Sequence, residues 1–170
     1  GNDLFKTVDG YYRVFPFVPG SQTVDVVEKP QEAYEAARQF GRFTKKLSVF
    51  DVSQLKITLP GFHDLSLRYR EFESALRSGN RERVAESSGL IATVIQHKTI
   101  VDEFEIYRSV LTARVTHHDT KISNVLFDKN DKGICVIDLD TVMPGYFISD
   151  VGDMMRTYLS PVNEEEKDFE

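Results

Sequence analysis

The sequence is poor in the features that mark secreted and membrane proteins. It contains a single cysteine in 170 residues, so no intramolecular disulfide can form, and the place of Cys135 within an apolar run predicts a reduced, buried thiol. No segment reaches the apolar length that spans a bilayer, and the N-terminus lacks a signal-peptide pattern. These absences predict a cytoplasmic protein with no membrane partner.

An excess of basic charge is also lacking. The chain carries 27 acidic and 21 basic residues, a net charge of −6 at pH 7. Nucleic-acid-binding proteins generally present a basic face that releases counterions from phosphates, so the composition argues against nucleic acid as a partner but allows a local basic cluster for one nucleotide. With 41% hydrophobic and 28% charged residues, the chain has the composition of one globular domain or of one lobe of a larger protein.

Two short apolar runs in the second half of the chain predict a β-hairpin. Residues 124–127 and 134–137 flank a polar segment that ends in Gly133. A polar, glycine-containing connection supplies the positive φ angles that a hairpin loop needs. The two runs are therefore expected to pair as short antiparallel strands.

Pairing of these strands would gather three polar side chains. The loop before the first strand carries Asp119 and Asn124, and the second strand ends at Asp138. The hairpin brings that loop next to the end of the second strand, so the three side chains are expected to converge. Two carboxylates and an amide oxygen suit Mg²⁺ held jointly with phosphate oxygens.

The same residues carry a resemblance to a known family. Residues 117–124, His-His-Asp-Thr-Lys-Ile-Ser-Asn, fit the H-x-D-x-x-x-x-N catalytic loop of protein-kinase-like enzymes, and Asp138 takes the place of the Asp that begins the D-F-G element. The sequence resembles the small-molecule branch of that superfamily, which holds aminoglycoside phosphotransferases, choline kinases and type II homoserine kinases. Within this branch, residues 119–127 and 135–145 are most similar to N-acetylhexosamine 1-kinases.

The resemblance implies a role for each residue of the motif, with ATP and Mg²⁺ as cofactors. Asp119 would accept the proton of the substrate hydroxyl or orient that hydroxyl for in-line attack. Lys121 would counter charge on the transferred group, while Asn124 and Asp138 would hold Mg²⁺ on the nucleotide phosphates. His117 is expected to brace the loop rather than to take part in the chemistry.

The whole pattern predicts an α+β fold. The expected elements are strands over 4–8 and 11–15, helices over 30–49, 64–77 and 81–107, a strand over 114–116, the hairpin, a loop over 141–145 and a helix over 150–158. The segment 87–89 is expected to break or bend the third helix, and Asp150 is the expected N-cap of the last. This order of elements indicates α+β, and the resemblance implies mostly the helical C-terminal lobe of a protein-kinase-like fold.

Two further sets of residues have alternative interpretations. The resemblance implies that residues 1–20 are a strand pair and interlobe hinge, with Phe15, Phe17 and Val18 contacting adenine, and that residues 21–170 are a partial helical lobe. A strand end packed into the core is the alternative for the aromatic residues. Asp153 and Arg156 are weak candidates for acceptor contacts, and a structural ion pair that braces the catalytic loop is the alternative.

Some parts of the resembled enzymes are missing from the sequence. It contains no G-x-G-x-x-G or equivalent glycine loop and no strand lysine before Leu4 to cover the phosphates. The charged run 164–168 is followed only by two residues, where those enzymes continue through further helices. The chain therefore resembles a fragment, expected to have weak activity or none alone and to expose apolar surface that favours a homodimer.

The leading functional interpretation is an ATP-dependent phosphotransferase acting on the anomeric hydroxyl of an N-acetylhexosamine. Kinases for homoserine, choline or an aminoglycoside are the nearest alternatives. An inactive fragment or a non-catalytic binding module of the same fold is an alternative from another class. Because the sequence keeps Asp119, Asn124 and Asp138 together, we favour the catalytic interpretation.

Overall fold

The computed structural model of the protein describes residues 4–162. The helices are α1 (Pro30–Lys46), α2 (Leu65–Ser78), α3 (Arg81–Glu86), α4 (Ser88–Gln96), α5 (Thr99–Val110) and α6 (Phe147–Tyr158). The strands are β1 (Leu4–Thr7), β2 (Gly10–Arg13), β3 (Arg114–Thr116), β4 (Val125–Phe127), β5 (Gly133–Val136) and β6 (Met143–Gly145). The mixture of helices and small antiparallel sheets fits the predicted α+β class.

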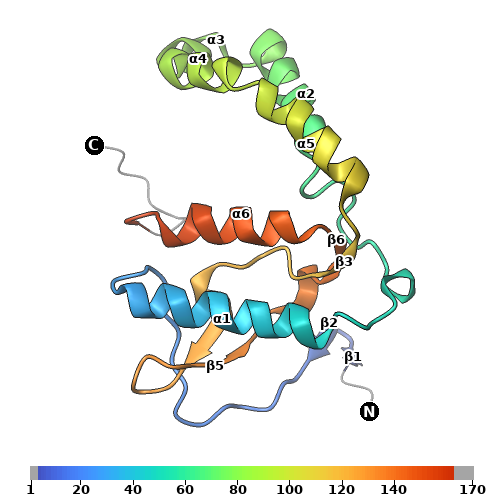
Figure 1. Ribbon diagram of the computed structural model, residues 1–170, viewed down its shortest axis with the longest axis vertical. Coiled ribbons are helices and arrows are strands. Elements are labelled where there is room, and N and C mark those ends of the chain that lie inside the picture. The colour runs from blue at the N-terminus through green and yellow to red at the C-terminus, as the bar shows by residue number, and fades with distance from the viewer. Residues whose placement is uncertain (1–3, 163–170) are drawn as a thin grey trace.

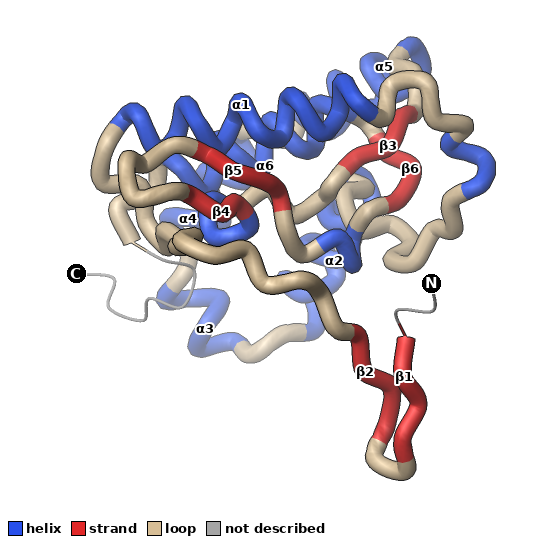
Figure 2. The backbone as a smooth tube through the Cα atoms, turned by 90° about the horizontal axis from the view of Figure 1, so that it is seen from below, coloured by secondary structure: helices blue, strands red, loops and turns tan. Residues whose placement is uncertain are grey.

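The elements form a body and a projecting arm (Figure 1). In the body, α1 and α6 lie side by side with the paired strands β3–β6 and β4–β5 next to them, and the arm consists of α2 to α5. Figure 2 shows the β1–β2 hairpin extending away from the body. Among residues 4–162, no helix is both long and apolar enough to cross a membrane.

The predicted hairpins are confirmed. β1 pairs with β2, and β4 pairs with β5 in a register that sets Val125 opposite Val136. Asn124, expected to open the first strand of the second hairpin, instead ends a short 3₁₀ turn before β4. Its side chain is therefore placed by the turn rather than by the alternation of a strand.

The prediction of a loop over residues 141–145 is wrong. Met143–Gly145 forms β6, which pairs antiparallel with β3 and sets Pro144 opposite Val115. A proline followed by a glycine indicates a turn locally, but proline is tolerated on an edge strand, and each strand of a two-stranded sheet is an edge. The long-range pairing with β3 outweighs the local signal.

Helix α1 is the main support of the β4–β5 hairpin. Pro30 opens the helix, and Glu32 Oε2 accepts a hydrogen bond from the backbone N–H of Lys29 at 3.1 Å. The apolar face of α1 contributes Ala36 and Phe40 to a core shared with the hairpin and the turn before it. The buried members of this core are Ala36, Phe40, Ile122, Val125 and Phe127.

Gly133 allows the close approach of α1 and β5. A Cβ atom there would lie 2.7 Å from Cγ of Gln39 and 3.1 Å from the backbone oxygen of Glu35. Gln39 Nε2 donates to the carbonyl of Gly133, and the N–H of Gly133 donates to Glu35 Oε2 at 3.2 Å. The next residue but one, Cys135, is half-buried rather than buried as predicted, because it borders an open groove between α1 and β5.

The arm confirms the predicted helices and adds a break. Asp64 caps α2 by accepting from the N–H of Leu67 at 2.8 Å, and the expected interruption near Ser87 separates α3 from α4. A second interruption at His97 and Lys98, with no glycine or proline to mark it, separates α4 from α5. In the described structure no residue of α2 to α5 is buried. The arm therefore depends for support on partly exposed contacts between its own helices and on its attachment to the body.

Candidate active site

The candidate catalytic loop, residues 117–121, follows β3 and is fastened by its backbone to α6. Asp150 Oδ2 accepts from the N–H of His117 at 3.0 Å, and Asp150 Oδ1 accepts from the N–H of His118 at 2.8 Å. Burial raises the pKa of Asp150, and these two backbone hydrogen bonds oppose the shift. The prediction that Asp150 is an N-cap is wrong: α6 begins at Phe147, so this carboxylate lies inside the helix and holds the loop instead.

Asp153, one turn further along α6, holds the next part of the loop. Its Oδ2 accepts from the N–H of Thr120 at 2.6 Å and lies 3.1 Å from the hydroxyl oxygen of the same residue, and its Oδ1 accepts from Arg156 at 2.8 Å. Asp153 is 8% exposed and Thr120 is fully buried. The side chain of Asp153 is thus engaged with the loop and with Arg156.

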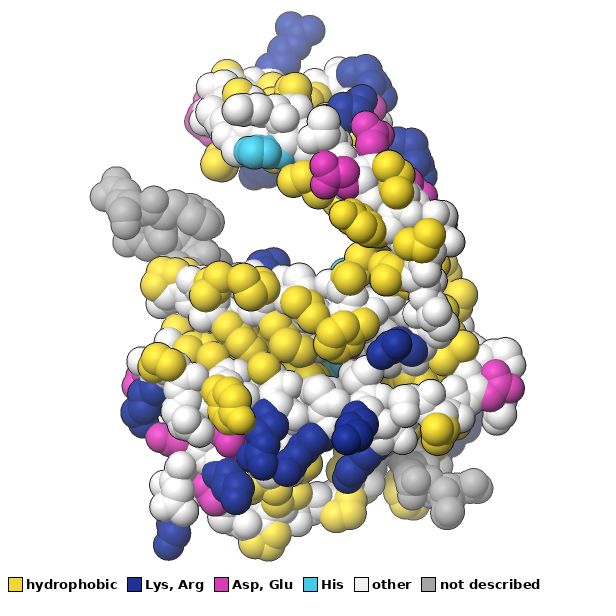
Figure 3. Space-filling view, viewed as in Figure 1, with side chains coloured by type: hydrophobic (Ala, Val, Ile, Leu, Met, Phe, Trp, Pro, Cys, Tyr) yellow, Lys and Arg dark blue, Asp and Glu magenta, His cyan; other side chains and the backbone are white. Residues whose placement is uncertain are grey.

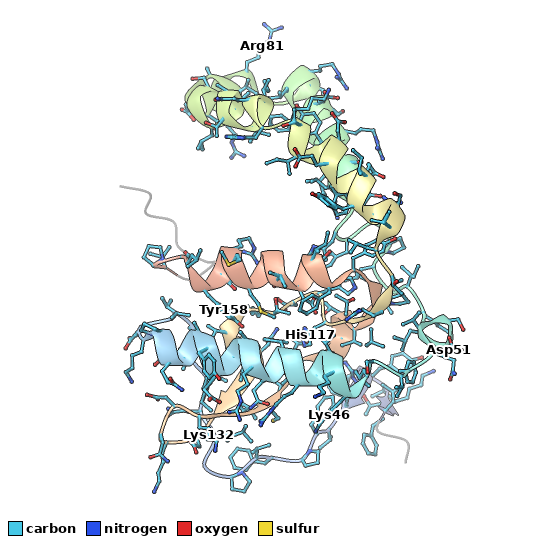
Figure 4. The ribbon with its side chains drawn as sticks, viewed as in Figure 1. Lys46, Asp51, Arg81, His117, Lys132 and Tyr158 are labelled. Carbon is cyan, nitrogen blue, oxygen red and sulfur yellow. The ribbon has the colours of Figure 1, made fainter. Side chains whose placement is uncertain are left out.

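His117 lies between α1 and α6 and links three segments of the body (Figure 4). Its Nδ1 accepts from the N–H of Asp119 at 3.3 Å, which leaves Nε2 to donate to the carbonyl of Ile137 at 3.1 Å. The ring is fully buried and packs edge-on against Phe40, with ring centroids 5.0 Å apart. These contacts connect the loop, the end of β5 and α1.

Asp119 and Asn124 are in direct contact. Asn124 Nδ2 donates to the carboxylate Oδ2 of Asp119 at 2.8 Å and to its backbone carbonyl at 2.9 Å. Lys121 Nζ lies 3.4 Å from the same carboxylate oxygen. Because the amide nitrogen of Asn124 is used in this way, its Oδ1 remains as a possible oxygen ligand.

Asp138 reaches the same end of the hairpin through the backbone. The N–H of Ile137 donates to the carbonyl of Asn124 at 2.9 Å, so Asp138 follows directly after a residue bonded to Asn124. Asp138 has φ 57° and ψ 67°, a left-handed conformation that is unusual for a residue with a side chain and is concentrated at functional sites. Its exposed carboxylate has no hydrogen-bond or ion-pair partner within residues 4–162.

The use of Asn124 and Asp138 as magnesium ligands stays a prediction. In the described part of the chain, no three His, Cys, Asp or Glu side chains gather as a metal cluster. The available ligands are the Asn124 oxygen, the carboxylate of Asp138 and the nearby carboxylate of Asp119. A set with so few protein oxygens suits Mg²⁺, which usually keeps waters and binds substrate phosphates as well.

The residues expected at the hinge are in an exposed segment. Phe15 is 67% exposed and Phe17 is 84% exposed, so packing of these two rings into the core, the alternative drawn from the sequence, is wrong. Val18 is half-buried, and its carbonyl accepts from the hydroxyl of Ser21 at 2.7 Å. The guanidinium of Arg13, at the end of β2, forms an ion pair with Asp140, two residues beyond Asp138.

A pocket beside the catalytic loop contains residues that sequence reasoning missed. His63 Nε2 lies 3.0 Å from the carbonyl oxygen of His118, and the two rings stack with centroids 5.2 Å apart. The pocket has a volume of about 240 Å³. It is lined by Ile57, Leu59, Gly61, Phe62, His63, Asp64, Phe104, Arg108, His118, Met143, Pro144, Gly145, Tyr146 and Ser149. No local motif marks these residues, which come together from the 57–64 loop, α5, the catalytic loop, β6 and α6.

Comparison with known protein families gives a match over almost the whole chain. The model of the phosphotransferase enzyme family matches residues 4–167. The matched region includes the loop 117–121, the β4–β5 hairpin and all of the pocket.

Proposed function

Because the chain belongs to the phosphotransferase enzyme family, we propose that it transfers the γ-phosphoryl group of ATP to a hydroxyl group of a small molecule. The observation that supports this most strongly is the fixed position of the Asp119 carboxylate. Asn124 holds it at 2.8 Å and Lys121 lies 3.4 Å away. Phosphoryl transfer depends mainly on positioning and charge neutralisation, so a carboxylate held in this way suits its task.

In this proposal Asp119 accepts the proton of the acceptor hydroxyl or orients the hydroxyl toward the phosphate. Lys121 counters negative charge near the transferred group. The N–H groups of residues 117 and 118 are bound to Asp150, so the loop keeps its shape while the hydroxyl is bound. Catalysis by pre-organised groups needs such rigidity, because little rearrangement then accompanies the reaction.

Mg²⁺ would be held by the Asn124 side-chain oxygen and by Asp138. When bound with ATP, it would neutralise charge on the nucleotide phosphates. Phe15, Phe17 and Val18 are proposed to meet the adenine. The exposure of both phenylalanine rings is compatible with a ligand stacked on them.

The proposed acceptor is an N-acetylhexosamine, phosphorylated at its anomeric hydroxyl. The support is the similarity of residues 119–127 and 135–145 to N-acetylhexosamine 1-kinases. Homoserine, choline and aminoglycosides are alternative acceptors. Assays with ATP, Mg²⁺ and a panel of these compounds would decide between them.

The test of the proposed chemistry is Asp119→Asn. The substitution keeps the size of the side chain and removes its ability to accept a proton, so phosphoryl transfer should fall by about two orders of magnitude or more. Asp102→Asn, at an exposed position on α5, is the matched control and should keep wild-type turnover. Undiminished turnover in Asp119→Asn would show that Asp119 is not the base, and binding of ATP without any turnover in the wild type would favour the inactive fragment or the non-catalytic module.

A homodimer is also proposed, on the evidence of exposed apolar surface. The surface is hollowed between the arm and the body, and hydrophobic side chains gather along α1 and α6 (Figure 3). An apolar groove of about 460 Å³ lies between these two helices. Exposed patches of this kind favour association, and sedimentation at micromolar concentration would detect it; a monomer would contradict the proposal.

A further inference from the structure

The backbone of His118, directly before the candidate base Asp119, has a strained conformation. Its φ of 71° lies in the left-handed region, which residues with a side chain seldom adopt. A conformation of this kind costs free energy and persists only where the surrounding contacts impose it. The contacts that impose it on His118 also determine where the chain enters Asp119.

The backbone groups on both sides of His118 are bound by distant parts of the chain. The N–H of His118 donates to Asp150 Oδ1 at 2.8 Å, and the carbonyl oxygen of His118 lies 3.0 Å from His63 Nε2. A carbonyl oxygen can only accept, so His63 is the donor and its Nε2 carries the hydrogen. The following N–H, that of Asp119, donates to His117 Nδ1 at 3.3 Å. The peptide group between residues 118 and 119 is thus bonded at both its oxygen and its nitrogen.

The ring of His118 gives no polar support of its own. It is 5% exposed, and neither ring nitrogen makes a hydrogen bond within the described structure. Packing confines the ring: it stacks on the ring of His63 with centroids 5.2 Å apart, and a Cβ atom at Gly145 would lie 2.6 Å from its Nε2. Polar fixation of this residue therefore depends on the backbone bonds to Asp150 and His63.

We infer that His63 is a positioning residue for Asp119, an assignment that rests on the proposed function. By donating to the carbonyl of His118, His63 fixes the plane of the peptide group from which the backbone of Asp119 continues. Asn124 holds the carboxylate of Asp119 separately, at 2.8 Å. Phosphoryl transfer depends on such placement, because a displacement of about 1 Å can lower a rate about a hundredfold.

His63 is itself held where the arm joins the body. The ring of Phe62 packs edge-on against the ring of His63, with centroids 4.6 Å apart. The next residue, Asp64, accepts from the N–H of Leu67 at 2.8 Å at the start of α2 and pairs with Arg108 of α5 at 3.2 Å. Both neighbours of His63 are therefore fixed by other contacts. His63 connects the root of the arm to the candidate catalytic loop.

The first test compares two substitutions of His63 in the full chain, with ATP, Mg²⁺ and N-acetylglucosamine as substrates. Leucine removes the donor, whereas glutamine offers an amide N–H in place of Nε2 and cannot titrate. His63→Leu should lower kcat about tenfold or more with the KM for ATP unchanged, and His63→Gln should keep kcat within about threefold of the wild type. His97→Leu, the same exchange at an exposed histidine that ends α4, is the matched control and should keep wild-type turnover.

The second test needs no turnover. NMR of the chain labelled with ¹³C and ¹⁵N observes the carbonyl of His118 and the N–H of Asp119 directly. In His63→Leu the carbonyl signal should shift, and the amide of Asp119 should exchange with deuterium about fivefold faster or more. In His63→Gln and His97→Leu both observations should stay close to those of the wild type.

The outcomes separate this inference from the proposed function. Wild-type kcat in His63→Leu, or unchanged exchange of the Asp119 amide in that variant, would overturn the inference even if the wild type transfers phosphate. Equal losses in His63→Leu and His63→Gln would rule out the hydrogen bond as the cause, and a raised KM for ATP at unchanged kcat would exclude a role in placing the base. Conversely, the expected NMR changes without any turnover in the wild type would contradict the proposed function and leave the hold of His63 on the backbone at Asp119 in place.

Discussion

The side-chain amide of Asn124 bridges two oxygens of Asp119, the carboxylate Oδ2 at 2.8 Å and the backbone carbonyl at 2.9 Å. The same amide therefore fixes both the side chain and the local backbone of the candidate base. Asn124 is 4% exposed, so water cannot easily replace these hydrogen bonds. The proposed metal ligand therefore directly positions the proposed base.

Asn124→Asp should remove the two hydrogen bonds that Asn124 donates to Asp119. The substitution replaces a donor with a second carboxylate facing Asp119, and like charges at this distance repel and favour protonation of one of them. We expect phosphoryl transfer to fall about a hundredfold or more, since small displacements of a base can have such effects. Turnover measured beside Asn80→Asp provides the control: Asn80 caps α3 through its side-chain oxygen, and aspartate caps equally well. Equal turnover in both variants would contradict the bridging role.

Thr120→Val should weaken the attachment of the loop to α6. The hydroxyl of Thr120 donates to the carbonyl of Asp150 at 2.8 Å and lies 3.1 Å from Asp153 Oδ2. Valine has the same shape but leaves these buried acceptors with fewer partners, which costs about 1–3 kcal/mol. Urea denaturation would measure the loss of unfolding free energy. The same exchange at Thr93, whose exposed hydroxyl bonds only to a carbonyl of its own helix, should change stability by less than about 0.5 kcal/mol, and a comparable loss there would argue against a special role for Thr120.

Gly145→Ala should disturb the packing of His118. A Cβ atom at residue 145 would lie 2.6 Å from Nε2 of His118 and 3.0 Å from Oγ1 of Thr116. Relief of this overlap requires movement of a buried ring, at a cost of about 1–3 kcal/mol. Gly152→Ala is the contrasting variant, because nothing lies within 4 Å of a Cβ there and alanine favours a helix over glycine by up to about 1 kcal/mol. Thermal denaturation should show opposite signs for the two variants, and a stabilised Gly145→Ala would refute the packing argument.

The stability of the protein should decrease in mild acid because of His118. Burial of the ring is the largest cause, and the charge of neighbouring His63 the second, that lowers the pKa of His118 from 6.5 to about 4. The backbone of Met143 and Pro144 opposes part of this pKa shift, although neither ring nitrogen makes a well-oriented hydrogen bond within the described structure. Between these pH values the unfolded chain binds a proton that the folded chain excludes. This contribution to stability is therefore complete above pH 6.5 and is lost as the pH falls toward 4, by about 2–3 kcal/mol.

The variant that tests this pH dependence is His118→Asn. Asparagine tolerates the φ of 71° at this position better than most residues, and it does not titrate. Between pH 6.5 and 4, the unfolding free energy of the wild type should change more steeply with pH than that of the variant. Asp150 has a raised pKa, which acts in the opposite sense, and it contributes equally to the slopes of the wild type and the variant. His97→Asn, on the exposed arm, should keep the wild-type slope. Parallel slopes in His118→Asn and the wild type would contradict the assignment.

Sequence reasoning succeeded where the determinants are local. The H-x-D-x-x-x-x-N loop, the two hairpins and the amphipathic α1 are each encoded within a few consecutive residues, and the contact between Asp119 and Asn124 lies within one such motif. The expected meeting of Asp138 with that pair is supported only through the backbone bond between Ile137 and Asn124. The roles assigned to these residues stay predictions.

The failures concern residues whose environment is created by distant parts of the chain. Aspartate is a residue type that commonly caps helices, so position 150 gives a local signal for an N-cap. Only the packing of α6 against the loop makes the Asp150 carboxylate an acceptor for two backbone N–H groups. Likewise β6 exists because β3 pairs with it. His63 is 55 residues away in sequence from His118, whose carbonyl it contacts. No periodicity or motif carries this information.

The attachment of the loop to α6 has an implication for how this fold can diversify. Asp150 of α6 accepts hydrogen bonds from the backbone N–H groups of residues 117 and 118. Every amino acid except proline provides such an N–H group. These hydrogen bonds to α6 therefore do not depend on which side chain residue 118 carries, although its φ of 71° favours residues such as asparagine. A substitution at residue 118 that tolerates this backbone conformation should therefore leave the backbone of the adjacent Asp119 in place.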